Sequence, residues 1–555
     1  MTPQPEPNEA LRQAIAAAQA GRLAEADHLC GQILAADAAD PGALCLSGAL
    51  AAQRGDVAGA ITRYRAALAA APRFIKALSN LGAALSALQR FEDAAEPLRR
   101  ALEEQPDHGP ALINLGQVYL ALGRVEEAIA LLRRATQSAP QDAMAWNNLG
   151  AALLRAEQLR EAEAPLRQAL ALEPGYGAAW SNLGHAHFRL RRPAEAASDF
   201  RRALESGAAP AETWTHLGAA LRAMGQMSEA MAAYERALQI NPDYAEGRFA
   251  RALQRLADGH FAQGWEDYRF RPSARAFHAD RAAGLSRLPA DLAGRKIFLA
   301  GNQGFGDELF FLRYAPALKA RGARISYRPG AKLAPLLGGA AFIDELLADD
   351  AQPTADIRLL IDDLPYVLGE EVTAPPLALK PNEARLAALR ERLAALGPAP
   401  YLGLTWRSGI DKNGALFKEA PLAAVAQAVR GWPGAILALQ RAPMAGEIDA
   451  VAAAAGAPVH DLTSLNDDLV EMHALLALLD EYAAVSNTNV HLRQSLGLPS
   501  RVLVPMPPDW RWMASGDASP WFPGTRIYRQ AADGAWDAAL ARLSQDLKAV
   551  FRSPS

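Results

Sequence analysis

The 555-residue chain has few cysteines, little net charge and no long apolar run. Its two cysteines, Cys30 and Cys45, form no C-x-x-C pattern, which argues against a disulfide framework or a zinc site and predicts two buried thiols in a reducing compartment. The formal net charge is −4 without a basic tract, so no nucleic-acid surface is expected. No uncharged apolar run approaches the roughly 18 residues of a membrane span. Because the first residues also lack the basic and apolar regions of a signal peptide, we expect a cytoplasmic protein.

The first half of the chain is an internal repeat. Glycine recurs every 34 residues, at Gly48, Gly82, Gly116, Gly150, Gly184 and Gly218. Alanine follows each glycine after 12 residues and again after 19, and proline follows most of them after 24. The fifth repeat departs from the proline rule, with Ala208 and a displaced Pro210. This pattern resembles the tetratricopeptide repeat (TPR), a helix–turn–helix unit of about 34 residues that buries its apolar face against its neighbours.

The repeat continues outward in degraded form, as expected of end caps. Ala14 and Ala26 mark a first unit, and Ala252 and Tyr268 mark a last one. We therefore predict an all-α TPR superhelix of about seven to eight repeats over residues 7–270.

A polar residue precedes each repeat glycine by two positions, at Asn80, Asn114, Asn148, Asn182 and His216. An amide both donates and accepts, so a row of amides can bind the backbone of an extended peptide whatever its sequence. The TPR array of O-GlcNAc transferase is similar, with an asparagine ladder that holds protein acceptors. Asparagine is also common at this position in TPR sequences generally, so an inherited scaffold role stays open. Under both interpretations we expect the groove to bind a protein.

The second half alternates β-rich and helical segments, which predicts parallel sheets with crossover helices. After a linker at 271–293, an N-terminal lobe at 294–398 has expected strands at 296–300, 323–328 and 357–361 and helices at 308–320 and 331–337. A C-terminal lobe at 399–530 has expected strands at 401–406, 435–439, 482–486 and 501–505 and helices at 420–429, 467–479 and 490–496. A C-terminal helix lies within 531–555. Two doubly wound lobes place their strand-end loops on the two sides of a cleft.

The first expected strand of this half ends in a glycine loop with Gly301, Gly304 and Gly306, followed by Asp307. A strand that turns into a helix in this way directs backbone N–H groups at one point, where anionic or polar ligands bind. Asp307 is placed to cap that helix and to face the cleft. The spacing is neither that of a dinucleotide fingerprint nor that of a P-loop.

Three motifs of the second half occur in a characteristic order: G-N-Q-G-F-G-D at 301–307, G-L-T-W-R-S-G at 403–409, and P-P-D-W-R-W-M at 507–513 followed by S-P-W-F-P. Over about residues 289–530 they resemble the GT-B glycosyltransferases, in particular their heptosyltransferase-like domain. TPR array plus GT-B domain is the layout of O-GlcNAc transferase and of the FlmG-type flagellin glycosyltransferases. The implied fold is a TPR superhelix followed by two Rossmann-like lobes. Two positions depart from the family pattern: Ser486 replaces an aspartate, and Arg407 replaces a small residue.

The resemblance implies a metal-independent protein O-glycosyltransferase that needs no cofactor. Asp307 would occupy the position of the catalytic base, with helix capping as the alternative. The remaining expected donor-binding residues are Gly304, Gly306, Arg407, Ser408, Lys412, Lys418, Asn487, Thr488, Asn489, His491 and Arg493. For the cations the alternative is a solvated surface charge, and for His491 it is a capping or core role.

Arg407 and Arg493 would suit a donor with two anionic groups, so we favour a CMP-nonulosonic acid over a UDP-sugar. The FlmG-type resemblance favours flagellin as the acceptor, modified on Ser or Thr with a pseudaminic-type sugar. Open alternatives are an O-GlcNAc-transferase-like enzyme using UDP-GlcNAc, a non-catalytic TPR scaffold with a GT-B relic, and a glycan or lipid-precursor transferase.

Overall fold

The computed structural model describes residues 9–207, 210–278, 285–301, 304–348, 351, 353–369, 374–408 and 418–550. By its internal contacts the chain divides into two compact units, Met1–Ala209 and Pro210–Ser555. Each unit is described by itself.

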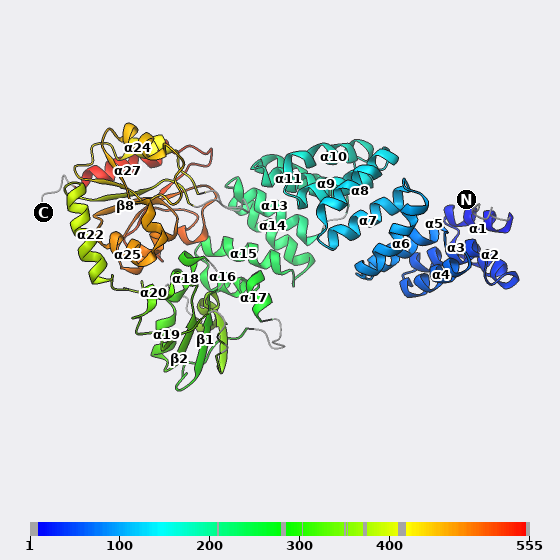
Figure 1. The fold of residues 1–555 in the computed structure, drawn as a ribbon, viewed down its shortest axis with the longest axis horizontal. Coiled ribbons are helices and arrows are strands. Elements are labelled where there is room, and N and C mark those ends of the chain that lie inside the picture. The colour runs from blue at the N-terminus through cyan, green and yellow to red at the C-terminus, as the bar shows by residue number, and fades with distance from the viewer. Residues whose placement is uncertain are drawn as a thin grey trace. The chain divides into compact units, whose positions relative to one another are not determined.

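The first unit consists of antiparallel helix pairs that stack in sequence order (Figure 1). The helices are α1 (Glu9–Gln19), α2 (Leu23–Ala36), α3 (Pro41–Gln53), α4 (Val57–Ala70), α5 (Ile75–Ala87), α6 (Phe91–Glu104), α7 (Gly109–Ala121), α8 (Val125–Ser138), α9 (Ala143–Arg155), α10 (Leu159–Leu172), α11 (Gly177–Arg189) and α12 (Pro193–Glu205). The predicted all-α TPR array is confirmed.

The repeat glycines are explained by close helix contact. A Cβ on Gly82 of α5 would lie 2.3 Å from Leu98 Cγ of α6, and one on Gly150 of α9 would lie 2.5 Å from Leu166 Cγ of α10. In both pairs the partner comes 16 residues later, so each repeat makes the same contact within itself. The glycine therefore recurs every 34 residues because the two helices of each pair pack too closely there for a side chain.

The two cysteines also behave as predicted. Cys30 and Cys45 are free and buried, and burial is the largest cause that raises the pKa of each thiol, to about 11. They pack as small apolar side chains.

The second unit begins with further helices of the repeat pattern: α13 (Ala211–Ala223), α14 (Met227–Ile240), α15 (Ala245–Ala257) and α16 (Phe261–Tyr268), followed by α17 (Pro272–Phe277). Trp265 and Tyr268 of α16 share one buried core with Phe311 and Trp510 of the α/β part. The repeat pattern predicts an array boundary near residue 270, whereas internal contacts divide the chain at 209/210. The last repeat, formed by α15 and α16, belongs to the core of the α/β part.

The N-terminal lobe is a four-stranded parallel sheet of order β3-β2-β1-β4 (Figure 1). Its elements are β1 (Lys296–Ala300), α18 (Phe305–Leu312), α19 (Ala315–Ala320), β2 (Arg324–Arg328), α20 (Ala334–Leu337), β3 (Glu345–Leu346), β4 (Ile357–Leu360), η1 (Ile361–Asp363) and α21 (Leu364–Leu368). The single helix expected at 308–320 is two helices, because Pro316 starts α19 and cannot continue α18. The short edge strand β3 was not anticipated by the sequence pattern.

The C-terminal lobe is a six-stranded parallel sheet of order β10-β9-β8-β5-β6-β7. Its elements are α22 (Glu383–Leu396), β5 (Leu402–Thr405), α23 (Leu422–Ala428), β6 (Ile436–Ala438), α24 (Glu447–Ala455), β7 (Val459–Asp461), η2 (Thr463–Asp467), α25 (Leu469–Leu478), β8 (Glu481–Val485), α26 (Thr488–Ser495), β9 (Arg501–Val504), η3 (Trp510–Trp512), β10 (Arg526–Arg529) and α27 (Asp537–Ala549). Numbered within the lobe this is the Rossmann order, with its switch point between β5 and β8. The sequence pattern missed β7, β10 and α24.

Alternate residues of the C-terminal strands face two helix layers. On β6, Ile436 and Ala438 join the core under α23, α24 and α27, whereas Leu437 joins the core that includes α25. The strands are therefore apolar on both faces, as a buried parallel sheet requires. This is why they appear in the sequence as unbroken apolar runs.

The predicted linker at 271–293 begins with a buried ion cluster. Arg271, 1% exposed, donates to the carboxylates of Asp362 and Asp363, and His278 lies 2.8 Å from Asp363. Since both aspartates belong to η1, this cluster fastens α17 to the N-terminal lobe. Over the described residues, no helix is long and apolar enough to cross a membrane.

Candidate functional site

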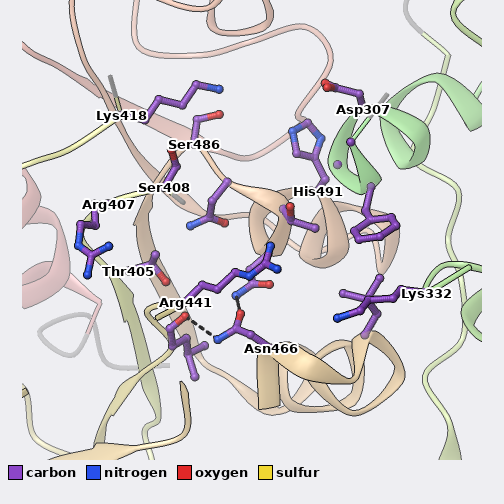
Figure 2. Close-up of a pocket in the computed structure, with 18 residues that line it drawn as sticks. Asp307, Lys332, Thr405, Arg407, Ser408, Lys418, Arg441, Asn466, Ser486 and His491 are labelled. Carbon is purple, nitrogen blue, oxygen red and sulfur yellow. Dashed lines mark hydrogen bonds between the residues drawn. The ribbon is translucent and has the colours of Figure 1, made fainter. Parts of the chain in front are cut away.

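A pocket lies at the carboxyl ends of β5 and β8, the switch point of the C-terminal sheet (Figure 2). Thr405 ends β5 and Ser486 follows β8, and both line it. The facing wall comes from the N-terminal lobe, with the turn Gly304–Asp307 and Lys332. The two predicted lobes thus contribute the two sides of one cleft.

The N-terminus of α26 opens into this pocket. Asn487 caps the helix by accepting from the backbone N–H of Val490 at 3.1 Å, and Asn487, Thr488 and Asn489 all line the pocket. The first N–H groups of a helix have no partner within it, and the helix dipole adds partial positive charge there. The Asn489 amide is itself engaged, donating to Asn466 at 3.0 Å.

Two of the predicted basic and hydroxyl residues lie beside this helix start. Lys418 and Ser408 line the pocket and belong to adjacent backbone segments, since the Ser408 N–H donates to the Lys418 carbonyl at 2.8 Å. The Lys418 ammonium lies 3.3 Å from the carboxylate of Asp509. Lys412, predicted with them, lies outside the described residues.

The prediction for Arg493 is wrong in its geometry. Its guanidinium is buried and donates to the carbonyls of Pro499, Leu476, Leu479 and Asp480, so it supports the fold behind α26. It sits in the second turn of α26 on the side away from the pocket, and spacing alone could not reveal this.

Arg407 lines the pocket but its charge is already paired. Its guanidinium donates to Glu447 at 2.9 Å and 3.3 Å and to the Ala442 carbonyl, and in Figure 2 it lies at the edge of the group. Arg407 and Arg493 therefore do not form the expected pair of anion-binding arginines. Both positions are satisfied by groups of this chain.

Asp307 faces the pocket from the first turn of α18. It does not cap that helix: the N-cap is Gly304, and no side chain bonds there. Its carboxylate instead accepts from Arg511 at 2.6 Å. The adjacent Glu308 is buried in the N-terminal lobe, where its carboxylate accepts from the Tyr327 hydroxyl and the Gly330 N–H. Of the acidic pair, Asp307 therefore faces the cleft and Glu308 belongs to the core of the lobe.

Gly306 lines the pocket at a point where two helices approach closely. A Cβ at Gly306 would lie 2.9 Å from Cδ2 of His491 on α26. His491 is 7% exposed, its ring meets Phe522, and its Nδ1 has no partner among the described residues. Burial, and then nearby Arg511 and Lys418, lower the pKa of His491 well below its ordinary value, so the ring is neutral at pH 7.

Several lining residues were missed by the sequence reasoning. Lys332 and Arg441 are exposed cations at the pocket, and Asn466 fixes the loop after β6 by donating to the Leu439 carbonyl at 3.2 Å. Figure 2 shows Arg441 reaching across the middle of the group. Arg511, which binds Asp307 but is not among the lining residues, had a signal, since it belongs to the P-P-D-W-R-W-M motif. Lys332 and Arg441 lie outside the helices and strands and Asn466 lies in η2, without a distinctive pattern.

The predicted ladder residues occupy equivalent positions on the first helix of their repeats. Asn182 donates to Asn147 at 2.9 Å and Asn147 donates to Asn148 at 3.4 Å, so two rungs are joined through a residue that the repeat pattern did not single out. Asn80 points to the Cys45 sulfur at 3.8 Å, whereas Asn114 is half-buried with no partner among the described residues.

His216 occupies the equivalent position on α13, in the second unit. Burial lowers the pKa of His216 to about 4, so this ring is neutral at physiological pH.

Comparisons with known proteins agree with the repeat architecture. The family model described as the cilia and flagella-associated protein 70 C-terminal domain matches residues 75–267. The chain is 27% identical over 333 residues to protein FlbA of Caulobacter vibrioides, covering 55% of this chain and 55% of FlbA, and thus spans about half the length of that relative.

Among solved structures, a TPR protein from Parabacteroides merdae is 17% identical with a TM-score of 0.36, covering 44% of this chain and 97% of its own. A thermophilic TPR protein from Thermus thermophilus is 25% identical with a TM-score of 0.30, covering 33% and 99%. The helix pairs and the two sheets define the class: a TPR-containing protein with a C-terminal α/β region of two parallel sheets. It is distantly similar to FlbA.

Proposed function

We propose that this protein is a protein O-glycosyltransferase that moves a sugar from a nucleotide-sugar donor to Ser or Thr of a protein bound by its TPR helices. One observation carries the proposal: a helix N-terminus with Lys418 on one wall of the cleft faces the carboxylate of Asp307 on the other. Sugar transfer to a hydroxyl needs positive charge for the departing phosphate and a base for the hydroxyl proton.

In this proposal the α26 N-terminus, Lys418 and Ser408 receive the donor phosphate. Ser486, 3% exposed at the end of β8, replaces the family's aspartate and adds a hydroxyl rather than a negative charge beside the phosphate. Asp307 takes the proton of the acceptor hydroxyl. The resemblance to FlmG-type enzymes supports flagellin as the acceptor.

The donor class is open between CMP and UDP. The two arginines on which a doubly anionic donor was expected are both engaged, so a CMP-nonulosonic acid is now supported by the resemblance alone. A thermal-shift comparison of CMP and UDP on the full chain discriminates, because a ligand of the native state at 100 times its Kd adds about 2.7 kcal/mol of stability. Stabilisation by neither nucleotide would favour a non-catalytic scaffold.

Intact-mass analysis of flagellin tests the reaction itself. A strain lacking this protein should carry unglycosylated flagellin, and a strain with Asp307→Asn should match it. Normal flagellin glycan in the deletion strain would remove flagellin as the acceptor. Glycan lost on deletion but retained with Asp307→Asn would remove Asp307 as the base.

A further inference from the structure

Asp307 does not stand alone in the cleft, since its carboxylate is held by an arginine from the other lobe. Arg511 lies on η3, in the segment between β9 and β10, and its Nη2 donates to Asp307 Oδ1 at 2.6 Å. The Arg511 side chain is 9% exposed and that of Asp307 is 32% exposed. The contact joins a buried cation to a carboxylate that still reaches solvent.

Arg511 is fixed in one orientation. Its Nη1 donates to both oxygens of Asp509, at 3.1 Å and 3.3 Å, and its guanidinium carbon lies 4.4 Å above the Trp510 ring and 4.9 Å above Phe310. A planar guanidinium suits such combined stacking and forked donation, which an ammonium cannot reproduce. The group that holds Asp307 is therefore rigid, unlike an exposed arginine.

The same contacts link Asp307 to the anion-binding side of the pocket. Asp509 is shared by Arg511 and Lys418, so the charges alternate from Lys418 through Asp509 and Arg511 to Asp307. Burial would raise the pKa of Asp509, but Arg511 and Lys418 outweigh it and hold that pKa well below its ordinary range.

We propose that Arg511 is the positioning residue for Asp307: it holds Oδ1, so that Oδ2, which accepts no hydrogen bond from a described residue, is presented to the cleft. The catalytic meaning of this rests on the proposed function, in which Asp307 is the base. The competing explanation is a simple clamp between the lobes. A clamp would affect stability without setting the reactivity of the Asp307 carboxylate.

The test is carbodiimide labelling of carboxyl groups with glycine ethyl ester at one fixed pH, read by peptide mass spectrometry on the full chain. Arg511 covers Oδ1 of Asp307, so Arg511→Met should raise the rate at which Asp307 is labelled several-fold. Arg511→Lys should restore part of that protection. Both variants leave Glu308 and Tyr268, which interact electrostatically with Asp307, in place.

Arg501→Met is the matched control. Arg501 is 11% exposed and ion-paired with Glu481 in the same lobe, so its loss perturbs the fold without touching Asp307. An unchanged rate of Asp307 labelling in Arg511→Met, or an equal rise in Arg501→Met, would overturn the proposal.

Measuring the glycan on flagellin in strains with the same variants distinguishes the positioning role of Arg511 from the proposed glycosyltransferase function. Loss of the glycan with Arg511→Met and its partial recovery with Arg511→Lys would support the positioning role. If flagellin from the wild-type strain carries no glycan while Arg511→Met still speeds the labelling of Asp307, the proposed glycosyltransferase function is overturned and the hold of Arg511 on Asp307 stands.

Discussion

The repeat helices and the cleft are built from contacts of different range along the chain. In the array, Gly82 meets Leu98 and Gly150 meets Leu166, each within one repeat. In the cleft, Asp307 meets Arg511 across two lobes, and Gly306 meets His491. Contacts within one repeat produce a periodic pattern in the sequence, whereas contacts between distant residues produce none. Substitutions in the array and in the cleft test the two kinds of contact separately.

The largest effect is expected at the cleft. Asp307→Asn keeps the size of the side chain but removes its basicity, and general-base catalysis contributes about 10²- to 10⁴-fold. We expect the rate of sugar transfer to fall by that factor. The stabilisation by the preferred nucleotide should persist, because Asp307 lies on the wall opposite the proposed phosphate site.

The measurement is the rate of acceptor glycosylation followed by intact mass. A variant that transfers at the wild-type rate would show that the hydroxyl proton goes elsewhere, and loss of nucleotide stabilisation would show that Asp307 contributes to donor binding.

The second-largest effect is expected at the buried ion cluster around Arg271. Arg271→Met leaves Asp362 and Asp363 buried without their main cation, and breaking a buried ion pair in this way costs about 3–5 kcal/mol. Urea denaturation measures the loss. Arg275→Met on the same helix is the control, since its partner Glu246 is 3.4 Å away and both side chains are more than half exposed; it should change stability by at most about 1 kcal/mol. If the two variants unfold at the same urea concentration, the buried cluster does not contribute the expected stability.

Two glycines test the local contacts of the array. Gly82→Ala forces a Cβ against Leu98, and overpacking of this kind costs about 1–3 kcal/mol. Gly31→Ala, on an exposed face of α2 where a Cβ meets nothing within 4 Å, should instead stabilise by about 0.5–1 kcal/mol. Thermal melts of the two variants should therefore move in opposite directions. Shifts of the same sign would mean that the repeat glycine is not a packing requirement.

Acid should weaken the second unit through His473. Burial lowers the pKa of His473 on α25 to about 4, against about 6.5 for a free side chain. Between pH 6.5 and pH 5 the unfolded chain takes up a proton that the folded chain refuses, so stability falls as the pH falls, by about 2 kcal/mol for this residue. His473→Gln should flatten the pH dependence of urea unfolding over that range. An unchanged slope would assign the acid sensitivity to other groups.

The smallest expected effect is at a single rung of the ladder. Asn114 has no partner among the described residues, so Asn114→Ala should weaken acceptor binding by about 1 kcal/mol, the worth of one hydrogen bond, without loss of stability. Asn182→Ala breaks an existing bond to Asn147 and should lower stability as well. Calorimetry with the acceptor measures the affinity of each variant, and thermal melts measure its stability. If neither variant changes acceptor affinity, the asparagines are inherited scaffold.

Much of the fold could be predicted because its causes are periodic. The 34-residue spacing identified the helix pairs, and unbroken apolar runs such as Tyr401–Trp406 identified central strands buried on both faces. Two of the missed elements have little of their own to bury: β3 spans two residues and β7 three, both at sheet edges. The helix expected at 308–320 was split by a proline that the apolar pattern concealed.

The candidate site was predicted in part. The motifs brought Asp307, Lys418, Ser408 and the start of α26 to one pocket, because strand-end loops of parallel sheets converge at the switch point. The arginines failed for a specific reason: Arg407 and Arg493 look alike in the sequence, but one is neutralised by Glu447 and the other is consumed by backbone carbonyls. A residue type states what a side chain could bind, and only its neighbours decide whether it is free to do so.

By itself the sequence determined the TPR array, the two parallel α/β lobes and the loops that form the cleft, since each depends on patterns of spacing and burial. The tertiary structure alone decided that the last repeat shares the core of the α/β part, that Gly306 packs closely against His491, and that Asp307 is held by Arg511. The last of these contacts joins residues 204 positions apart. Their energy depends on distance and burial in the folded chain, which leave no local trace in the order of the amino acids.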